Sequence, residues 1–242
     1  MNIANKSVLI TGANRGIGQA LVNEALRRGV KRVYAGTRGT IENADTRVTP
    51  ITLDVTNVAE IQQAAREVGA LDVLINNAGI ALYDDLSNVD AMEKHFAVNV
   101  FGTFNVTRAF LPLLKHSRGA IINNLSIAAL APLPFIPAYS ISKAASSNMT
   151  QSLRALLAGE GVTVHAVFLG PIDTDMNRGL EIPKATPESA AQGIFDGLEN
   201  GEEDIFPDPA SRQLTEGWRS GVVKRLEREF AAFVPHSARV AA

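Results

Sequence analysis

A glycine-rich turn between two apolar segments constrains this chain more than any other feature. Ser7–Thr11 (SVLIT) is short, apolar and β-branched, which is typical of a buried strand. The turn Gly12–Gly18 (GANRGIG) follows, and apolar residues then recur at helical spacing as far as Gly29. A strand, a glycine turn and a helix N-terminus together present backbone N–H groups that suit a pyrophosphate. A tight turn that binds nothing is the alternative.

The same alternation of strand and helix continues along the chain. We expect strands at 7–11, 32–36, 48–53, 71–75, 119–125 and 162–169, with a short last strand at 204–207. We expect helices at 17–29, 57–68, 89–115, 139–158 and 187–198, with a weaker helical pattern over 211–233. This order predicts an α/β fold: a Rossmann-type doubly wound parallel sheet in a three-layer α/β/α arrangement. No linker or internal repeat interrupts residues 1–242, so one domain is the simplest account.

Composition excludes several classes of function. The net charge of −2 gives no basic field for nucleic acid or an acidic membrane surface. Cysteine is absent, which excludes disulfides, thiolate metal ligands and a cysteine nucleophile, and we expect no metal ion. No stretch is apolar for long enough to span a membrane, and the first residues lack a signal-peptide pattern. We therefore expect a cytoplasmic protein with neither a nucleic-acid nor a membrane partner.

Several residues of the predicted turn and sheet edge are candidates for binding a dinucleotide. In the turn they are Gly12, Asn14, Arg15, Gly16, Ile17 and Gly18. The second strand ends at Thr37 and Arg38, where an acidic residue would select the ribose hydroxyl of NAD. Two guanidinium groups, from Arg15 and Arg38, would instead suit the 2′-phosphate of NADP(H). The alternative is that both are solvated surface arginines. Asp54, beside Val55, either contacts the adenine or only caps its turn.

A proline-interrupted segment ends in a tyrosine and a lysine. Pro132, Pro134 and Pro137 predict an irregular loop between Ser126 and a helix that begins near Tyr139. Tyr139 and Lys143 are four residues apart, so they share one helix face. The ammonium group would favour the phenolate and lower the tyrosine pKa, which starts near ~10. Such a tyrosine can exchange a proton with a substrate oxygen near neutral pH.

These features together resemble the short-chain dehydrogenase/reductase family in its single-domain branch. The resemblance rests on five signals in order, from Ser7 to about Phe206: Thr11–Gly18, Asn76–Gly79, Asn99, Ser126, and Tyr139 with Lys143. It implies a catalytic tetrad of Asn99, Ser126, Tyr139 and Lys143. Tyr139 would be the general acid or base, Ser126 would hydrogen-bond the substrate oxygen, and Lys143 would also bind the nicotinamide ribose. Asn99 would distort its helix and hold a water that relays protons.

The resemblance also implies further cofactor contacts. They are Asn77, Ala78, Gly79, Gly170, Ile172 and Thr174. The last two would act from a mobile lid at about 173–186. The chain departs from the family pattern at two positions. Leu169 stands where the family often has a proline, and Leu125 stands where it often has a serine. Neither removes a catalytic group, although both change the pocket.

The function expected is NADPH-dependent reduction of a small-to-medium apolar ketone, or oxidation of the corresponding secondary alcohol. Leu130, Leu133, Phe135, Ile136 and Met176 would supply an apolar pocket. A 3-oxoacyl reductase and a non-catalytic NADPH-binding regulatory protein are the alternatives. The resemblance further implies a homodimer or homotetramer that packs through Phe101–Lys115 and Tyr139–Ala158, although burial within one subunit would also explain these apolar residues.

Other residues are expected to be structural. In the helix predicted over 89–115, the core candidates are Phe96, Val100, Phe104 and Phe110. His95 is read as a satisfied or exposed helix residue rather than a catalyst. His165 alternates with apolar neighbours in its predicted strand and is read as structural. The tail Pro235–Ala242 is expected to be poorly ordered.

Overall fold

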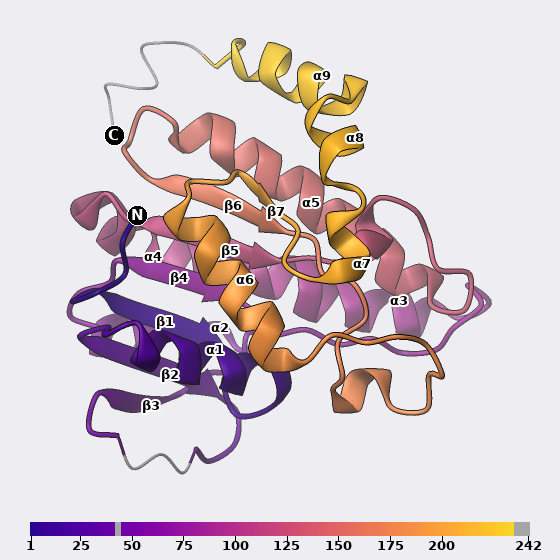
Figure 1. The fold of residues 1–242 in the computed structure, drawn as a ribbon. Helices are drawn as coiled ribbons and strands as arrows, with labels where there is room; N and C mark the ends of the chain where they lie inside the picture. The colour runs from indigo at the N-terminus through magenta and orange to yellow at the C-terminus, as the bar shows by residue number, and fades with distance from the viewer. Residues whose placement is uncertain (42–44, 235–242) are drawn as a thin grey trace.

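Seven parallel strands form the centre of the molecule, in the spatial order β3-β2-β1-β4-β5-β6-β7 (Figure 1). Their bounds are β1 Ser7–Thr11, β2 Arg32–Thr37, β3 Val48–Thr52, β4 Val73–Asn76, β5 Ala120–Asn124, β6 Thr163–Val167 and β7 Asp204–Ile205. The structure is a computed structural model that describes residues 1–41 and 45–234. The chain winds from β1 outward to β3, and then from β4 outward to β7. The predicted doubly wound Rossmann-type sheet is confirmed.

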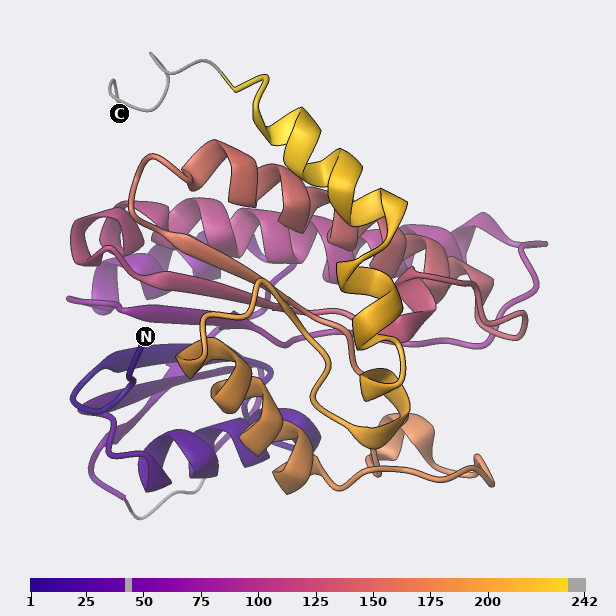
Figure 2. The same cartoon turned by 45° about the horizontal axis from the view of Figure 1, so that its top comes forward.

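Helices cover both faces of the sheet and complete three layers (Figures 1 and 2). One face carries α1 (Gly16–Arg27) and α6 (Pro187–Glu199), and the other carries α2 (Val58–Glu67), α4 (Thr103–Ser117) and α5 (Pro137–Leu157). Alternate residues of β1 supply the two cores. Val8 and Ile10 pack in the cluster with α1 and α6, whereas Leu9 packs in the cluster with α2 and α4. Burial on both faces explains why every residue of β1 is apolar or small.

Shorter elements lie mostly at the carboxyl edge of the sheet and along the C-terminal part of the chain. They are α3 (Val89–His95), the 3₁₀ turns Ile127–Ala129 and Asp175–Asn177, α7 (Pro209–Arg212), α8 (Thr215–Arg219) and α9 (Val222–Ala231). α9 runs alongside α5 in both views (Figures 1 and 2). Among the described residues, no helix is both long and apolar enough to cross a membrane.

The helix predicted over 89–115 is not continuous. A π-helical segment, Phe96–Gly102, separates α3 from α4. Phe110 is fully buried as expected, but Phe104 is not a core residue, because it lies on the outer side of α4 and is exposed. Phe101 is exposed as well. The expected disorder of the tail Pro235–Ala242 concerns residues outside the described part of the chain.

Local sequence explains where the main helices begin and end. α1 stops before Gly29, whose φ of +77° is readily adopted only by glycine. α5 begins at Pro137, a position where the missing N–H costs no helical hydrogen bond. Both helices start at the carboxyl edge of the sheet, so the glycine turn and Tyr139 face the same end of the molecule.

Candidate active site

The glycine turn after β1 is shaped by three glycines. Gly12 and Gly16 have φ values of +66° and +53°, in the left-handed region. A Cβ on Gly18 would lie 2.0 Å from the carbonyl oxygen of Gly12, so only glycine lets α1 approach the turn. Arg15, the residue before α1, makes no side-chain cap hydrogen bond. The first N–H groups of α1 therefore face the turn without competition from a capping side chain, which suits an anion.

The Asn76–Gly79 segment fixes this turn to the end of β4. The Asn77 amide nitrogen Nδ2 donates to the Thr11 carbonyl at 2.9 Å, and the backbone N–H groups of Asn77 and Ala78 both donate to Thr11 Oγ1 at 2.9 Å. Asn124 at the end of β5 donates to Asn77 Oδ1 at 3.0 Å. A Cβ on Gly12 would lie 3.0 Å from the Ala78 Cα. The turn, β4 and β5 thus form one rigid floor at the switch point of the sheet.

The two candidate phosphate-binding arginines are exposed and lie near carboxylates. Arg38, with 74% of its side chain exposed, has Nη1 3.9 Å from Asp54 Oδ2. Arg15 has Nη1 3.6 Å from Asp175 Oδ2. Burial alone would raise the pKa of Asp54, but hydrogen bonds from Thr56 and the charge of Arg38 outweigh it and lower the pKa. Thr37 is buried, and its Oγ1 accepts from the Gly39 N–H.

Asn99 lies within the π-helical segment and reaches out of it. Its Oδ1 accepts from the Ile80 N–H at 3.0 Å, and its Nδ2 donates to the Ile80 carbonyl at 3.0 Å and to Ser142 Oγ at 2.9 Å. The Asn99 carbonyl accepts from the hydroxyls of Thr103 and Ser146, both at 3.0 Å. Asn99 therefore ties the chain after β4 to α5, the helix that carries Tyr139.

Ser126, Tyr139 and Lys143 come together beyond the end of β5. Ser126 begins the 3₁₀ turn Ile127–Ala129, and its Oγ accepts from the Ala128 N–H at 3.1 Å. Lys143 Nζ donates to the Asn124 carbonyl at 2.8 Å and lies 5.7 Å from the centroid of the Tyr139 ring. All three side chains are buried. A Cβ on Gly79 would lie 3.3 Å from Asn99 Oδ1 and 3.7 Å from Lys143 Nζ, so Asn99 and Gly79 border the same cluster.

The expected lowering of the tyrosine pKa is wrong for this structure. Burial raises the pKa of Tyr139, and a hydrogen bond with Ser126 only partly opposes it. Burial also lowers the pKa of Lys143 to about 8, so its ammonium group loses its proton at a lower pH than an exposed lysine does. Its amino group donates to the Asn124 carbonyl, and its position 5.7 Å from the ring centroid is the contact that the structure shows with Tyr139. Tyr139 is accordingly held as a neutral phenol, the form of a proton donor.

The segment that follows β6 reaches back over the glycine turn. A Cβ on Gly16 would lie 3.2 Å from Thr174 Cγ2. Ile172 is buried and bridges to Ala185, which closes the expected lid at its base. The Gly170 N–H donates to Asp208 Oδ2 at 2.8 Å. The sequence did not predict that Asp208 contacts the turn at Gly170, because the two residues are 38 positions apart in the chain.

Two further residues border the tyrosine and were not predicted there. His95 is a satisfied helix residue as expected: Nε2 accepts from the Leu82 N–H at 3.0 Å, and Nδ1 lies 2.7 Å from the Ala91 carbonyl. Its ring also meets the Tyr139 ring edge-on, with centroids 6.1 Å apart. Asp84 accepts from the Ala138 N–H in the first turn of α5. Ile136, the residue before α5, has no side-chain oxygen that could accept from the first N–H groups of the helix. This is the signal in the sequence that another residue, here Asp84, must cap α5.

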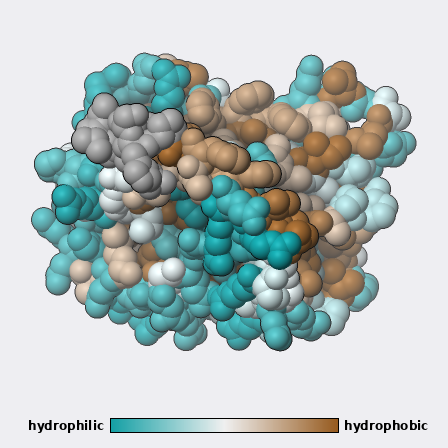
Figure 3. Space-filling model, turned by 90° about the horizontal axis from the view of Figure 1, so that it is seen from above, coloured by the Kyte–Doolittle hydropathy of each residue, from teal (hydrophilic) through white to brown (hydrophobic). Residues whose placement is uncertain are grey.

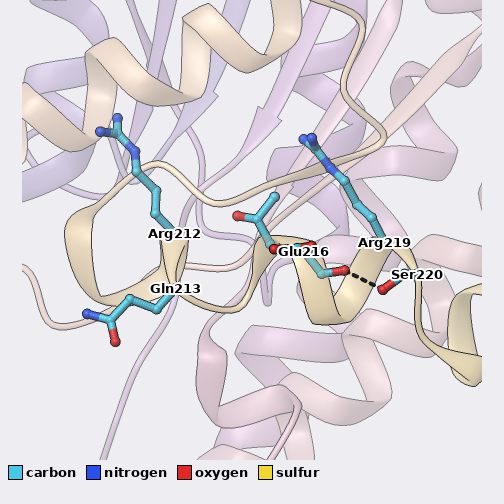
Figure 4. Close-up of a pocket in the computed structure, with 6 residues that line it drawn as sticks. Arg212, Gln213, Glu216, Arg219 and Ser220 are labelled. Carbon is cyan, nitrogen blue, oxygen red and sulfur yellow. Dashed lines mark hydrogen bonds between the residues drawn. The ribbon is translucent and has the colours of Figure 1, made fainter.

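A surface hollow elsewhere does not belong to this cluster. It lies along α7 and α8 and is lined by Arg212, Gln213, Thr215, Glu216, Arg219 and Ser220. In the close-up the side chains of Arg212 and Arg219 extend side by side in one direction and stay apart at their tips, whereas Gln213 points away from both (Figure 4). Arg219 pairs with Glu202 at 2.9 Å. The hollow contains none of the expected catalytic residues.

Comparisons with known proteins agree with this geometry. A family model described as short chain dehydrogenase matches residues 6–184. A 2-(S)-hydroxypropyl-CoM dehydrogenase of Xanthobacter autotrophicus is 34% identical over 208 residues, which cover 79% of this chain and 82% of that one. A crystal structure of a short chain dehydrogenase from Burkholderia cenocepacia in complex with NADP has a TM-score of 0.87 and 36% identity, with 97% of this chain and 100% of that chain covered. An NADPH-bound carbonyl reductase from chicken fatty liver has a TM-score of 0.75 and 28% identity, covering 85% and 100%.

Proposed function

Because this chain belongs to the short-chain dehydrogenase family, we propose that it is an NADPH-dependent carbonyl reductase of small-to-medium apolar ketones. The observation that carries the proposal is the buried cluster of Ser126, Tyr139 and Lys143 beside the glycine turn. The same residues would serve alcohol oxidation in the reverse direction. When bound, NADPH would supply the hydride for the carbonyl carbon.

The chain's own residues would supply the proton and the electrostatics. Tyr139, kept as a phenol by its raised pKa, donates its proton to the carbonyl oxygen as the alcohol forms. Ser126 hydrogen-bonds the same oxygen and stabilises the negative charge that develops on it. Lys143 would bind the nicotinamide ribose and help to reprotonate Tyr139. Asn99 would hold the relay water, for which its contacts to Ile80 and Ser142 fix its side chain.

We assign the residues of the proposed dinucleotide site to the parts of the cofactor, beginning with the glycine turn. Gly12, Asn14, Arg15, Gly16, Ile17 and Gly18 would hold the pyrophosphate, since no Cβ fits at Gly18 and the α1 N-terminus has no side-chain cap. Arg15 and Arg38, with Thr37, would bind the 2′-phosphate, because both guanidinium groups are exposed and their ion pairs with Asp175 and Asp54 are long, at 3.6 Å and 3.9 Å. Asp54 and Val55 would border the adenine. Asn77, Ala78, Gly79 and Gly170 would line the cofactor, and Ile172 and Thr174 would contact its carboxamide and phosphates. NADP-bound and NADPH-bound structural relatives support the choice of cofactor.

We also propose that the protein is a homodimer or homotetramer. The exposed Phe101, Phe104, Ile141 and Leu156 lie in or beside α4 and α5, the two helices expected to pack between subunits. Figure 3 views the molecule from the side of α9 and α5, and apolar residues gather in a band across this face. Light scattering should give two or four times the chain mass of 25.8 kDa.

The test of the activity is NADPH oxidation over a panel of ketones, with NADH in parallel and a 3-oxoacyl thioester included. Ketone-dependent oxidation that is stronger with NADPH would support the proposal, whereas preference for the thioester would favour a 3-oxoacyl reductase. Tyr139→Phe should keep NADPH binding and lose activity by about 10²-fold or more, because general acid catalysis is removed. NADPH binding without turnover of any carbonyl would indicate a regulatory protein instead. Full activity in the variant would disprove the role of Tyr139.

A further inference from the structure

The loop between β4 and α3 is held against the proposed active site by three separate polar contacts. Asn99 binds both the N–H and the carbonyl of Ile80, at 3.0 Å each. His95 accepts from the Leu82 N–H at 3.0 Å, and Asp84 accepts from the Ala138 N–H at 3.2 Å. These contacts end on the π-helical segment, on α3 and on the first turn of α5. The loop is therefore a positioned wall rather than a free surface loop.

This wall carries an exposed aromatic pair. Tyr83 lies between the two anchored residues Leu82 and Asp84, and its ring centroid is 6.1 Å from that of Phe135, at an interplanar angle of 35°. Tyr83 is 72% exposed and Phe135 43% exposed. In both ribbon views the loop and the segment before α5 lie side by side at one end of the molecule (Figures 1 and 2).

The segments that carry the pair are connected to the proposed proton donor through neighbouring residues. Phe135 precedes Tyr139 by four residues, and the Asp84 side chain that follows Tyr83 bonds to Ala138, the residue next to Tyr139. His95, which holds Leu82, meets the Tyr139 ring edge-on. Leu82 and Leu86 add exposed apolar surface on the same loop. The two segments that carry the aromatic pair are thus the same segments that position Tyr139.

We propose that Tyr83 and Phe135 form a specificity-determining wall that selects carbonyl substrates with an aromatic substituent. Aromatic rings gain offset or edge-on contacts with a flat π system beyond the burial of area, which a short alkyl chain cannot provide. The loop on both sides of Tyr83 is bonded in place before a ligand arrives, which lowers the conformational entropy lost on binding. This inference rests on the carbonyl reductase activity proposed above and names the substrate class of that site.

The experiment compares 2-alkanones that end in a phenyl group with the same ketones without it, at saturating NADPH. We expect the wild type to prefer the phenyl ketones in kcat/KM. Tyr83→Ala and Phe135→Ala should each lower kcat/KM for phenyl ketones by about 3- to 10-fold, mainly through KM, the range one aromatic contact provides. Activity on the plain alkanones should stay within about twofold in Tyr83→Ala, and Tyr83→Phe should keep the wild-type preference. Phe135→Ala should lose more kcat/KM on the phenyl ketones than on the plain alkanones.

A matched control is Phe230→Ala. Phe230 and Phe233 form another exposed ring pair, with centroids 6.0 Å apart, at the end of α9 and away from Tyr139. This variant should change neither ketone class. An equal loss on both classes in the Tyr83 and Phe135 variants, or a wild type without phenyl preference, would overturn the inference while leaving the reductase activity established. If no ketone is reduced at all, the activity itself fails, and the inference fails with it.

Discussion

In the protein without cofactor, the buried charge of Lys143 lowers the free energy of unfolding. It is buried, its Nζ donates to a backbone carbonyl, and burial is the cause that lowers its pKa to about 8. The unfolded chain keeps this proton up to about pH 10.5, whereas the folded protein keeps it only to about pH 8. Between these values the unfolded state holds more protons, so the free energy of unfolding rises with pH. Below pH 8 both states are protonated, and the full cost of the buried charge remains.

Lys143→Met should therefore stabilise the protein in the absence of cofactor. The pKa change from 10.5 to about 8 corresponds to about 3 kcal/mol, and loss of one hydrogen bond leaves an expected gain of about 1–3 kcal/mol at pH 7. Urea unfolding from pH 7 to 10.5 should show the gain shrinking as the wild type loses the proton. Lys115→Met, at a more exposed lysine, is the control. An advantage that does not change with pH would show that Lys143 does not titrate in this range.

Arg38 is the residue at which cofactor choice can be tested most directly. Arg38→Asp should lower kcat/KM for NADPH by about 10- to 100-fold, because a charged hydrogen bond to the 2′-phosphate is lost and a like charge replaces it. The value for NADH should hold or rise, since a carboxylate can bind the ribose hydroxyls. Arg32→Asp, at the opposite end of β2, should leave the ratio unchanged. An unaltered NADPH/NADH ratio in the Arg38 variant would remove this residue from the phosphate site.

At the scale of single elements, the features predictable from sequence are those set by local chemistry. The turn Gly12–Gly18 was predictable because a Cβ at Gly18 would overlap a carbonyl, and β1 because every residue suits burial. The π-helical segment was not predictable as an element, because the partners of Asn99 are Ile80 and Ser142, 19 and 43 positions away. The family resemblance predicted a role for Asn99, but it predicted neither the hydrogen-bond partners of Asn99 nor the bounds of the π-helical segment.

The direction of α9 shows the same limit. Its periodicity predicts a helix, and the apolar stripe would ordinarily face the core. In the structure Val222, Leu226 and Phe230 are exposed, whereas Lys224 and Glu227 face inward. The reason is a set of charges from distant parts of the chain, which no local pattern reveals. Equally, the anchors of the Tyr83 loop depend on α3 and α5 packing together.

At the scale of the whole molecule, one buried charge cluster joins the last helix to the sheet. Lys224 Nζ lies 2.8 Å from Glu203, 2.7 Å from Asp204 and 2.9 Å from Glu227. Arg154 of α5 pairs with Asp204 at 2.8 Å and with Glu227. Trp218 of α8 donates to Asp204 at 2.9 Å. The cluster connects α5, β7, α8 and α9, and the Phe168–Phe206–Trp218 ring contacts lie beside it.

Removing one member should release the C-terminal helices and destabilise the entire domain. Lys224→Met leaves Asp204 and Glu227 with Arg154 as their remaining strong cation, and breaking such a buried pair costs about 3–5 kcal/mol. Urea unfolding should show this loss, and limited proteolysis should cut first between α8 and α9. Arg225→Met removes an exposed cation 3.9 Å from Glu229 and should cost less than about 0.5 kcal/mol. Equal stability of the two variants would mean that the inward charges of α9 contribute nothing to the stability of the fold.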